Sequence, residues 1–269
     1  MEGLSVVTIT YNEEKNIKNF IESHNKLANE IIVIDSGSTD NTVKIAKEMG
    51  AIVIYNKWDG YAKQWNFGIK RCTYDWIVIG DADHVITKQL ANEINIIITN
   101  KKNEYDAYYM PRKNIMFGKW VKHGGFYPDI PYARMFKNGK GLFDEEQTIH
   151  EKLKVDSNKI GKLNGDILHY TYFDFNSYIE KLNKYTELEA LSKIQNKSTV
   201  KSSSNRIIDK NKIKSKIPFR TFLMFVYRYI FKLGILDGKV GFIMAFSSAF
   251  YEFAINVKVW QKNATKTDI

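Results

Sequence analysis

Two aspartates, Asp81 and Asp83, carry the clearest chemical signal in the sequence. They follow an apolar run from Trp76 to Ile79, rich in β-branched residues, that predicts a strand buried on both faces of a sheet. Open α/β sheets bind ligands at the carboxyl ends of such strands. Carboxylates placed there are costly unless they are paired, hydrated or bound to a cation, and their oxygens suit Mg²⁺ or Mn²⁺. The pattern indicates either a divalent-cation site or, with equal weight on this stretch alone, an acidic turn after a strand.

Strand and helix patterns alternate through the first hundred residues and supply the frame for these carboxylates. Buried strands are predicted over 4–10, 30–35, 51–55 and 76–79, and helices over 16–27, 42–49, 60–71 and 89–100. The alternation predicts right-handed βαβ units and hence a mainly parallel, Rossmann-like α/β sheet. Residues 107–141 break into aromatic, basic and Gly/Pro-rich segments, which we expect to form acceptor-side loops. A further helix is expected over 172–195.

Polar groups also follow the first two predicted strands. Tyr11, Asn12 and Glu13 come after the first strand, and Asp35 ends the second. Because the carboxyl ends of parallel strands meet at one edge of the sheet, these residues and Asp81 are expected to line one cleft. No G-x-G-x-x-G motif follows the first strand, which argues against a dinucleotide site of that kind, and no P-loop motif occurs, which excludes a P-loop.

Charge and cysteine content narrow the class of protein. The net charge of +10 favours an anionic partner, which nucleic acid, acidic lipid or a phosphorylated substrate would satisfy. The single cysteine, Cys72, excludes an internal disulfide and fits a reducing compartment, and we expect it to be a core residue rather than a reactive thiol. No basic segment followed by an apolar one opens the sequence, so no secretory signal is expected.

The last quarter of the chain differs in composition from the rest. Residues 196–216 are mostly Lys, Ser and Asn and predict a basic linker or mobile loop. Residues 219–236 and 240–260 are apolar and aromatic, with cations spaced through them. A spanning helix needs about 20 mainly apolar residues, so interfacial helices with snorkelling Lys and Arg fit better; a soluble helical pair is the alternative. The predicted division is therefore 1–195, 196–216 and 217–269, the last segment being membrane-associated.

Several motifs, taken in order, resemble those of family 2 inverting glycosyltransferases with the A-type fold. The three nucleotide-sugar motifs are ITYNEE at 9–14, DSGSTD at 35–40 and DAD at 81–83. Residues 58–68, 149–151, 168–172 and 232–238 are similar to the subgroup that includes the β-1,4-glucosyltransferase of lipopolysaccharide core assembly. Ile9 replaces the proline that many relatives carry there. The resemblance covers nearly the whole chain apart from the linker, and it implies a glycosyltransferase A-type sheet with a C-terminal helical extension.

The resemblance also implies roles for the residues that match. Tyr11 and Glu13 would line the nucleotide pocket, and Asp35 would accept a hydrogen bond from the base. Asp81 would lie near the ribose and the metal, and Asp83 would bind the divalent ion that holds the diphosphate.

Three further residues have two interpretations each. Lys63 and Asn66 are three residues apart on one helical face, so both would point at the sugar or diphosphate, or they would lie on a solvent-exposed face. His169 would be a third metal ligand, or a structural histidine after a strand.

An inverting transfer needs a carboxylate that takes the proton from the acceptor hydroxyl, and a cation that stabilises the leaving diphosphate. Glu151 is the favoured base, oriented by His150, because the His-Glu pair marks the subgroup. The commoner Glu-Asp base motif of the family is absent, and the alternatives are Asp144, Glu145 and Glu146.

The expected function is metal-dependent transfer of a hexose, glucose being favoured, from a UDP-sugar to a lipopolysaccharide-core or other glycolipid. Mg²⁺ or Mn²⁺ is the expected cofactor, and the inner face of the cytoplasmic membrane is the expected location, with no nucleic-acid partner. Transfer to polyprenyl phosphate is an alternative that needs no base. Sugar nucleotidyl transfer would need a Gly-rich basic loop after the first strand, which is missing. A non-catalytic basic module that binds membrane or nucleic acid would leave the strand-end carboxylates unexplained.

Overall fold

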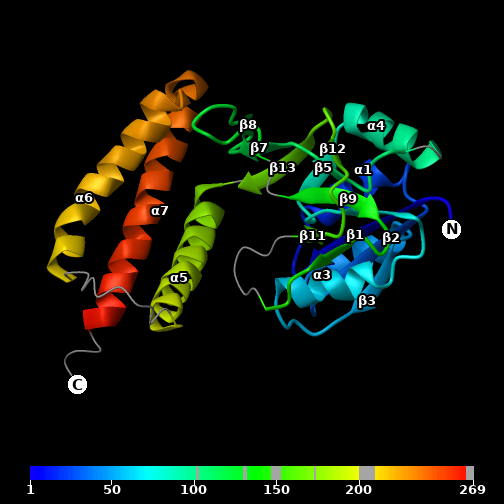
Figure 1. Cartoon of the computed structure of the whole chain (residues 1–269), viewed down its shortest axis with the longest axis horizontal. Coiled ribbons are helices and arrows are strands. Elements are labelled where there is room, and N and C mark those ends of the chain that lie inside the picture. The colour runs from blue at the N-terminus through cyan, green and yellow to red at the C-terminus, as the bar shows by residue number, and fades with distance from the viewer. Residues whose placement is uncertain (101–102, 130–131, 147–152, 173, 200–209, 265–269) are drawn as a thin grey trace. The chain divides into compact units, whose positions relative to one another are not determined.

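The computed structural model describes residues 1–100, 103–129, 132–146, 153–172, 174–199 and 210–264 (Figure 1). The chain divides into two compact units. The first unit comprises residues 1–114 and 128–171, and the second comprises residues 115–127 and 172–269. Each unit has its own hydrophobic core, and each is described separately below.

A seven-stranded sheet with the order β12-β6-β9-β4-β1-β2-β3 forms the centre of the first unit. Its strands are β1 (Leu4–Thr10), β2 (Glu30–Asp35), β3 (Ile52–Tyr55), β4 (Trp76–Ile79), β6 (Ala107–Tyr109), β9 (Ala133–Lys137) and β12 (Ile160–Lys162). The first four are mutually parallel, and β9 runs antiparallel to both β4 and β6. The mainly parallel α/β sheet predicted from the sequence is confirmed.

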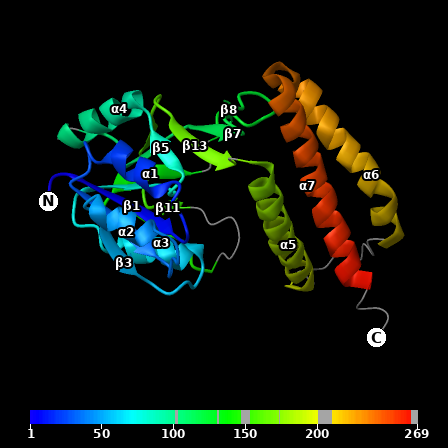
Figure 2. The same ribbon diagram turned by 180° about the vertical axis from the view of Figure 1, so that it is seen from behind.

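Helices cover both faces of this sheet, as Figures 1 and 2 show for α1 and α4 against α3. The helices are α1 (Ile17–His24), α2 (Thr42–Glu48), α3 (Tyr61–Ile69) and α4 (Lys88–Thr99). Phe20 of α1 and Leu90 of α4 share one core cluster with Val6, whereas Trp65 of α3 shares another with Val7. Successive strand residues point to opposite faces, which is why neighbours in β1 enter different clusters.

Short strands replace the loops that the sequence suggested for residues 107–141. Besides β6 and β9, they are β7 (Arg112–Met116), β8 (Lys119–Trp120) and β10 (Gly141–Phe143), and β10 pairs with β11 (Leu153–Val155). Near the end of β4, β5 (His84–Ile86) pairs antiparallel with β13 (Ile167–Tyr172). Strands of two to five residues with polar or aromatic members carry too weak a period-2 signal to be recognised in the sequence.

Three long helices dominate the second unit: α5 (Phe175–Thr199), α6 (Lys210–Val226) and α7 (Gly238–Ala264). A π-helical turn, η1 (Tyr227–Phe231), and a 3₁₀ turn, η2 (Gly234–Asp237), join α6 to α7. Tyr178 and Leu182 of α5 pack with Val240 and Met244 of α7 in one apolar cluster. This packing places α5 with the C-terminal helices, whereas the sequence-based division at residue 195 had assigned it to the catalytic domain.

Part of the predicted linker at 196–216 is helical in the structure. Helix α5 continues to Thr199 and α6 begins at Lys210, while residues 200–209 lie outside the described residues.

His24, at the end of α1, should make the protein less stable in mild acid. Its ring is fully buried and its Nδ1 lies 2.8 Å from the carbonyl oxygen of Phe20. Burial lowers the pKa of His24 from 6.5 to about 4, and the hydrogen bond to Phe20 opposes this only in part. The unfolded chain binds a proton near pH 6.5 and the folded chain does so only near pH 4. Stability is therefore fully present above pH 6.5 and falls as the pH drops towards 4, by about 3 kcal/mol.

Urea unfolding of the wild type and of His24→Gln at several pH values between 7 and 4 checks this prediction. The difference in unfolding free energy between the two proteins should narrow as the pH falls. A difference that does not change with pH would show that His24 is not the group responsible.

Candidate metal and nucleotide site

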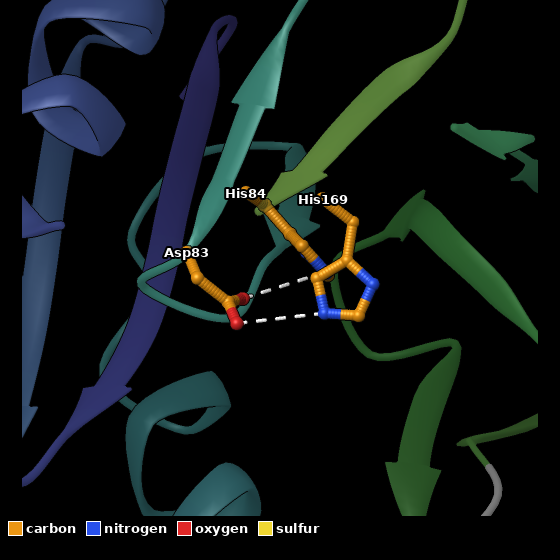
Figure 3. Close-up of side chains that lie close together, drawn as sticks. All are labelled: Asp83, His84 and His169. Atoms are coloured by element: carbon orange, nitrogen blue, oxygen red, sulfur yellow. Dashed lines mark ion pairs between the residues drawn. The ribbon is translucent and has the colours of Figure 1, made fainter. Parts of the chain in front are cut away.

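Asp83, His84 and His169 form a compact cluster at the carboxyl end of β4 (Figure 3). One potential ligand atom from each residue lies within 4.8 Å of those of the other two. The pairing of β5 with β13 sets His84 opposite His169, and their rings meet edge to face at 4.8 Å between centroids. Asp83 precedes β5, and its Oδ2 lies 3.4 Å from Nε2 of His169. The structure thus brings together two of the three residues that the sequence indicated as metal ligands.

The hydrogen bonds of His169 leave its Nε2 suited to bind a cation. Its Nδ1 lies 2.8 Å from the side-chain oxygen of Asn114, which can only accept, so we assign the ring proton to Nδ1. The lone pair of Nε2 then faces Asp83. An imidazole held by an outer oxygen acceptor is the usual arrangement of a metal-binding histidine. Asp83 and His169 therefore fit a divalent cation.

His84 has the opposite proton assignment. Its Nδ1 accepts the backbone N–H of Asp81 at 3.1 Å, so its proton is on Nε2. That nitrogen lies 3.3 Å from Oδ2 of Asp81 and 3.8 Å from Oδ1 of Asp83. Complete burial, followed by the charge of Arg134, lowers the pKa of His84 well below its ordinary value, so the ring is neutral. Nε2 of His84 lies near both carboxylates without hydrogen-bonding to either, and because it carries the ring proton it is not suited to be a third ligand.

Asp81 is held from its other side by a buried arginine. Nη2 of Arg134, on β9, donates to Oδ2 of Asp81 at 3.2 Å, and the guanidinium lies over the ring of Tyr132. The Arg134 side chain is only 1% exposed, whereas that of Asp81 is 40% exposed. Arg134 thus holds one oxygen of the Asp81 carboxylate. The rest of the side chain is open to solvent at the edge of the sheet, where a ribose or a cation can reach it.

Asp35 is buried and braces the turn that follows β2. Its Oδ2 accepts the backbone N–H groups of Gly37 and Ser38, both at 2.8 Å. Its Oδ1 accepts the hydroxyls of Ser38 at 2.5 Å and Thr10 at 3.1 Å. Gly37 has φ +99°, a conformation that favours glycine. Four donors fill the usual acceptor positions of the carboxylate, so a base could bind Asp35 only by displacing one of them.

Tyr11 and Glu13 lie on the loop after β1, which is tied to the turn after β2. Asn12 has φ +58°, donates its N–H to Ser38 Oγ at 2.9 Å and accepts the N–H of Thr39 at 2.8 Å. The Tyr11 side chain is exposed, and a Glu13 oxygen accepts from the Asn16 amide at 2.7 Å. Hydrogen bonds thus join the two loops into one rim beside the exposed ring of Tyr11.

Lys63 and Asn66 differ in environment although both line a cavity of about 580 Å³ beside α3. Lys63 is exposed and pairs with Asp59 at 2.6 Å. Asn66 is buried: its Nδ2 donates to the Phe143 carbonyl at 2.9 Å, and its Oδ1 accepts the Phe143 N–H at 2.8 Å. Nδ2 also lies 2.9 Å from Glu145 Oε1. These contacts give Asn66 a structural task, that of fixing β10 against α3.

Replacement of Asn66 by alanine should therefore cost stability. The substitution leaves both backbone groups of Phe143 buried without their partner, which we expect to cost about 2–4 kcal/mol. Lys63→Ala, on the same helix but exposed, should change the unfolding free energy by less than about 0.5 kcal/mol. Denaturant unfolding of the two variants provides the comparison, and equal small effects would contradict the structural role of Asn66.

The residues expected to act as the base are only partly described. Glu151 and His150 lie outside the described residues. Among the alternatives, Asp144 pairs with Lys154 at 2.6 Å, and this contact lowers the pKa of Asp144, which weakens it as a proton acceptor. Glu145 accepts from Asn66, as described above. Neither contact makes Asp144 or Glu145 a better candidate for the base than Glu151.

Three residues of the site were not identified from the sequence. His84 follows the DAD triplet directly, and this position next to the two carboxylates could have identified it from the sequence as a residue of the site. No signal in the sequence pointed to Asn114 or Arg134. These two residues reach the site through strands whose positions only the tertiary structure reveals.

Comparisons with known proteins identify the family. Residues 5–153 match the model of glycosyl transferase family 2. A protein of Rickettsia typhi named as an uncharacterized glycosyltransferase is 32% identical over 197 residues, which cover 71% of this chain and 68% of that protein. LpsC, a lipopolysaccharide core biosynthesis glycosyltransferase of Rhizobium meliloti, is 28% identical over 98% of this chain and 94% of its own. The solved structure of S. aureus TarS 1–349 in complex with UDP has a TM-score of 0.47 and 16% identity, covering 98% of this chain and 92% of that one.

Proposed function

The chain belongs to glycosyl transferase family 2, and from this premise we propose that it transfers a hexose, glucose being favoured, from a UDP-sugar to a lipopolysaccharide-core or related glycolipid. The full-length similarity to LpsC, whose name places it in lipopolysaccharide core biosynthesis, supports the acceptor class. The basic and apolar C-terminal region supports an acceptor that resides in the cytoplasmic leaflet of a membrane.

The observation that carries the metal-dependent part of the proposal is the Asp83–His169 pair. Oδ2 of Asp83 and the proton-free Nε2 of His169 lie 3.4 Å apart, and Asn114 holds the imidazole from behind. Asp83 and His169 would hold a divalent cation, with Asp81 adjacent to it. The imidazole nitrogen favours Mn²⁺ over Mg²⁺, which prefers oxygen ligands. Such a cation, when bound, neutralises the charge of the leaving diphosphate.

The remaining residues would bind and orient the reactants. The exposed ring of Tyr11 and the rim tied by Asn12 and Ser38 would receive the nucleotide. Glu151, oriented by His150, would take the proton from the acceptor hydroxyl as its oxygen attacks the anomeric carbon. Arg134 would keep the carboxylate of Asp81 in place.

A thermal-shift screen of nucleotide diphosphate sugars, each with Mn²⁺ and with Mg²⁺, tests the proposal. A ligand at a hundredfold excess over its Kd stabilises the folded protein by about 2.7 kcal/mol. We expect a UDP-sugar to raise the melting temperature only when a divalent cation is present. A larger shift with a different nucleotide would correct the donor, and no shift with any nucleotide sugar would overturn the proposal.

A further inference from the structure

The hairpin formed by α6, η1, η2 and α7 exposes an unusual amount of apolar surface. Large apolar side chains that are more than one-third exposed occur on both helices and on the turns between them. They are Phe219, Phe222, Leu223, Tyr227, Ile230, Phe231, Leu233, Ile235, Leu236, Phe242, Ile243, Phe246 and Phe250. Single exposed apolar residues are common on soluble proteins, but contiguous patches of this kind mark interaction sites.

The spacing of these residues places them on one stripe of each helix. On α7, Phe242, Phe246 and Phe250 recur every four residues and so lie on one face. Phe242 meets Phe225 and Tyr229 edge to face at 5.6 Å in both cases, so the surfaces of the two helices are continuous. We call the exposed side chains from Phe219 to Phe250 the hairpin face.

The exposed charges at the turn of the hairpin face, between α6 and α7, are positive. Residues 221–227 and 240–251 contain no charged side chain. Asp237, the only carboxylate between them, is 8% exposed and pairs with Nδ1 of His123 at 2.7 Å. Lys232 and Lys239 remain exposed at the turn. The surface therefore combines apolar side chains with a cationic margin, which matches an anionic membrane leaflet.

Polar contacts fix the C-terminal half of α7 to α5. Tyr251 donates to Glu189 at 2.7 Å, and Nζ of Lys258 lies within 2.9 Å of the Asn183 carbonyl and Thr186 Oγ1. Lys262 pairs with Glu187 at 2.7 Å. Residues 234–263 are long and apolar enough to cross a membrane by length and composition. These contacts would have to break before lipid could surround the helix.

The uncharged stretch of α7 that carries the exposed apolar stripe, residues 240–250, is too short to span a bilayer. Eleven helical residues, 240–250, extend about 16 Å at 1.5 Å per residue, whereas the hydrocarbon core is about 30 Å thick. Interfacial helices bury an apolar face about 5–10 Å deep in one leaflet, which requires only an exposed stripe.

We propose that the hairpin face lies in the interface of a single anionic leaflet, with Lys232 and Lys239 at the headgroups and α7 not crossing the bilayer. The inference deepens the proposed function, since it rests on a membrane-borne acceptor, and it specifies which surface meets the membrane and how far it enters.

Environment-sensitive labels on single introduced cysteines of the full chain test the depth of insertion. Burial raises the pKa of Cys72 to about 12, so the native thiol should stay unlabelled. Labels at Phe231→Cys and Phe246→Cys should be quenched by spin-labelled lipids in vesicles containing phosphatidylglycerol. Labels at Trp260→Cys and at the control Ile52→Cys, which are both exposed positions, should not be quenched by these lipids. A water-soluble quencher sealed inside the vesicles should reach none of them, whereas a spanning α7 would expose one end to it and overturn the proposal.

Charge substitutions test the surface itself. Phe231→Glu combined with Phe246→Glu should weaken vesicle binding at least tenfold, while the matched control Ile52→Glu in the first unit should leave it unchanged. Lys232→Gln with Lys239→Gln should weaken binding to anionic vesicles about fivefold per charge and leave binding to neutral vesicles unaltered. If the labels are instead buried without vesicles and the protein is a dimer by light scattering, a second copy covers the hairpin face and the proposal is wrong.

The UDP-sugar thermal shift, measured on the same preparations, separates the two ideas. Retained donor binding without vesicle binding would overturn only the membrane inference. Vesicle binding without any donor binding would overturn only the proposed function.

Discussion

Replacing Asp83 by asparagine should abolish sugar transfer and Mn²⁺-dependent UDP binding while the protein stays folded. The substitution removes the anionic oxygen that faces Nε2 of His169 at 3.4 Å. Loss of an outer-shell partner of a metal site typically costs 10–100-fold in affinity or activity, so loss of a ligand should cost more than about 100-fold. Calorimetric titration of UDP in the presence of Mn²⁺, together with transfer assays, measures both effects.

Asp75→Asn is the matched control for this experiment. Asp75 lies just before the other end of β4, where it pairs with the N-terminal ammonium at 3.1 Å, so its loss should leave UDP binding unchanged. If Asp83→Asn retains Mn²⁺-dependent UDP binding within a few-fold of the wild type, the cation is held elsewhere.

Glu151→Gln should cut transfer by roughly 10²–10⁴-fold, the contribution of a positioned general base. Glutamine is nearly isosteric and keeps a hydrogen-bonding oxygen, but it cannot take up a proton from the acceptor hydroxyl. Donor binding should therefore be unchanged, so that the loss appears in kcat and the Kd for the UDP-sugar stays constant. Initial rates and thermal shifts on the same sample give the two quantities.

The neighbouring carboxylates serve as controls for that assignment. Glu145→Gln and Glu146→Gln should retain most of the wild-type rate. If one of them is inactive while Glu151→Gln is active, the base lies in that part of the cluster. If all three variants are active, a phosphate acceptor that needs no base, such as polyprenyl phosphate, becomes the better account.

The first four strands and helices could be predicted from the sequence because their signals are local. The apolar runs at 4–10, 30–35 and 76–79 coincide with β1, β2 and β4, and the apolar spacing of residues 16–27 contains α1. The ordered motifs identified the family, which the match over residues 5–153 confirms. The strands are buried on both faces, as continuous apolar runs predict, and the buried residues of α1 follow the 3.6-residue period.

The rest depended on contacts between residues far apart in the sequence. Arg134 reaches Asp81 across 53 residues and Asn114 reaches His169 across 55, through short strands that have no clear pattern. The helical pattern of α5 was recognised, but its packing against α7 was not, because a helical pattern does not specify the partner of the helix. The proton positions that distinguish His169 from His84 are likewise set by tertiary hydrogen bonds.

Release of UDP from UDP-hexoses, with a bacterial glycolipid extract as acceptor, tests the central claim most directly. The full chain should release UDP and add the hexose to lipid when Mn²⁺ is present, stop when a chelator removes the cation, and resume when Mn²⁺ is restored. Transfer at an unchanged rate in excess chelator would contradict a metal-dependent mechanism at Asp83 and His169.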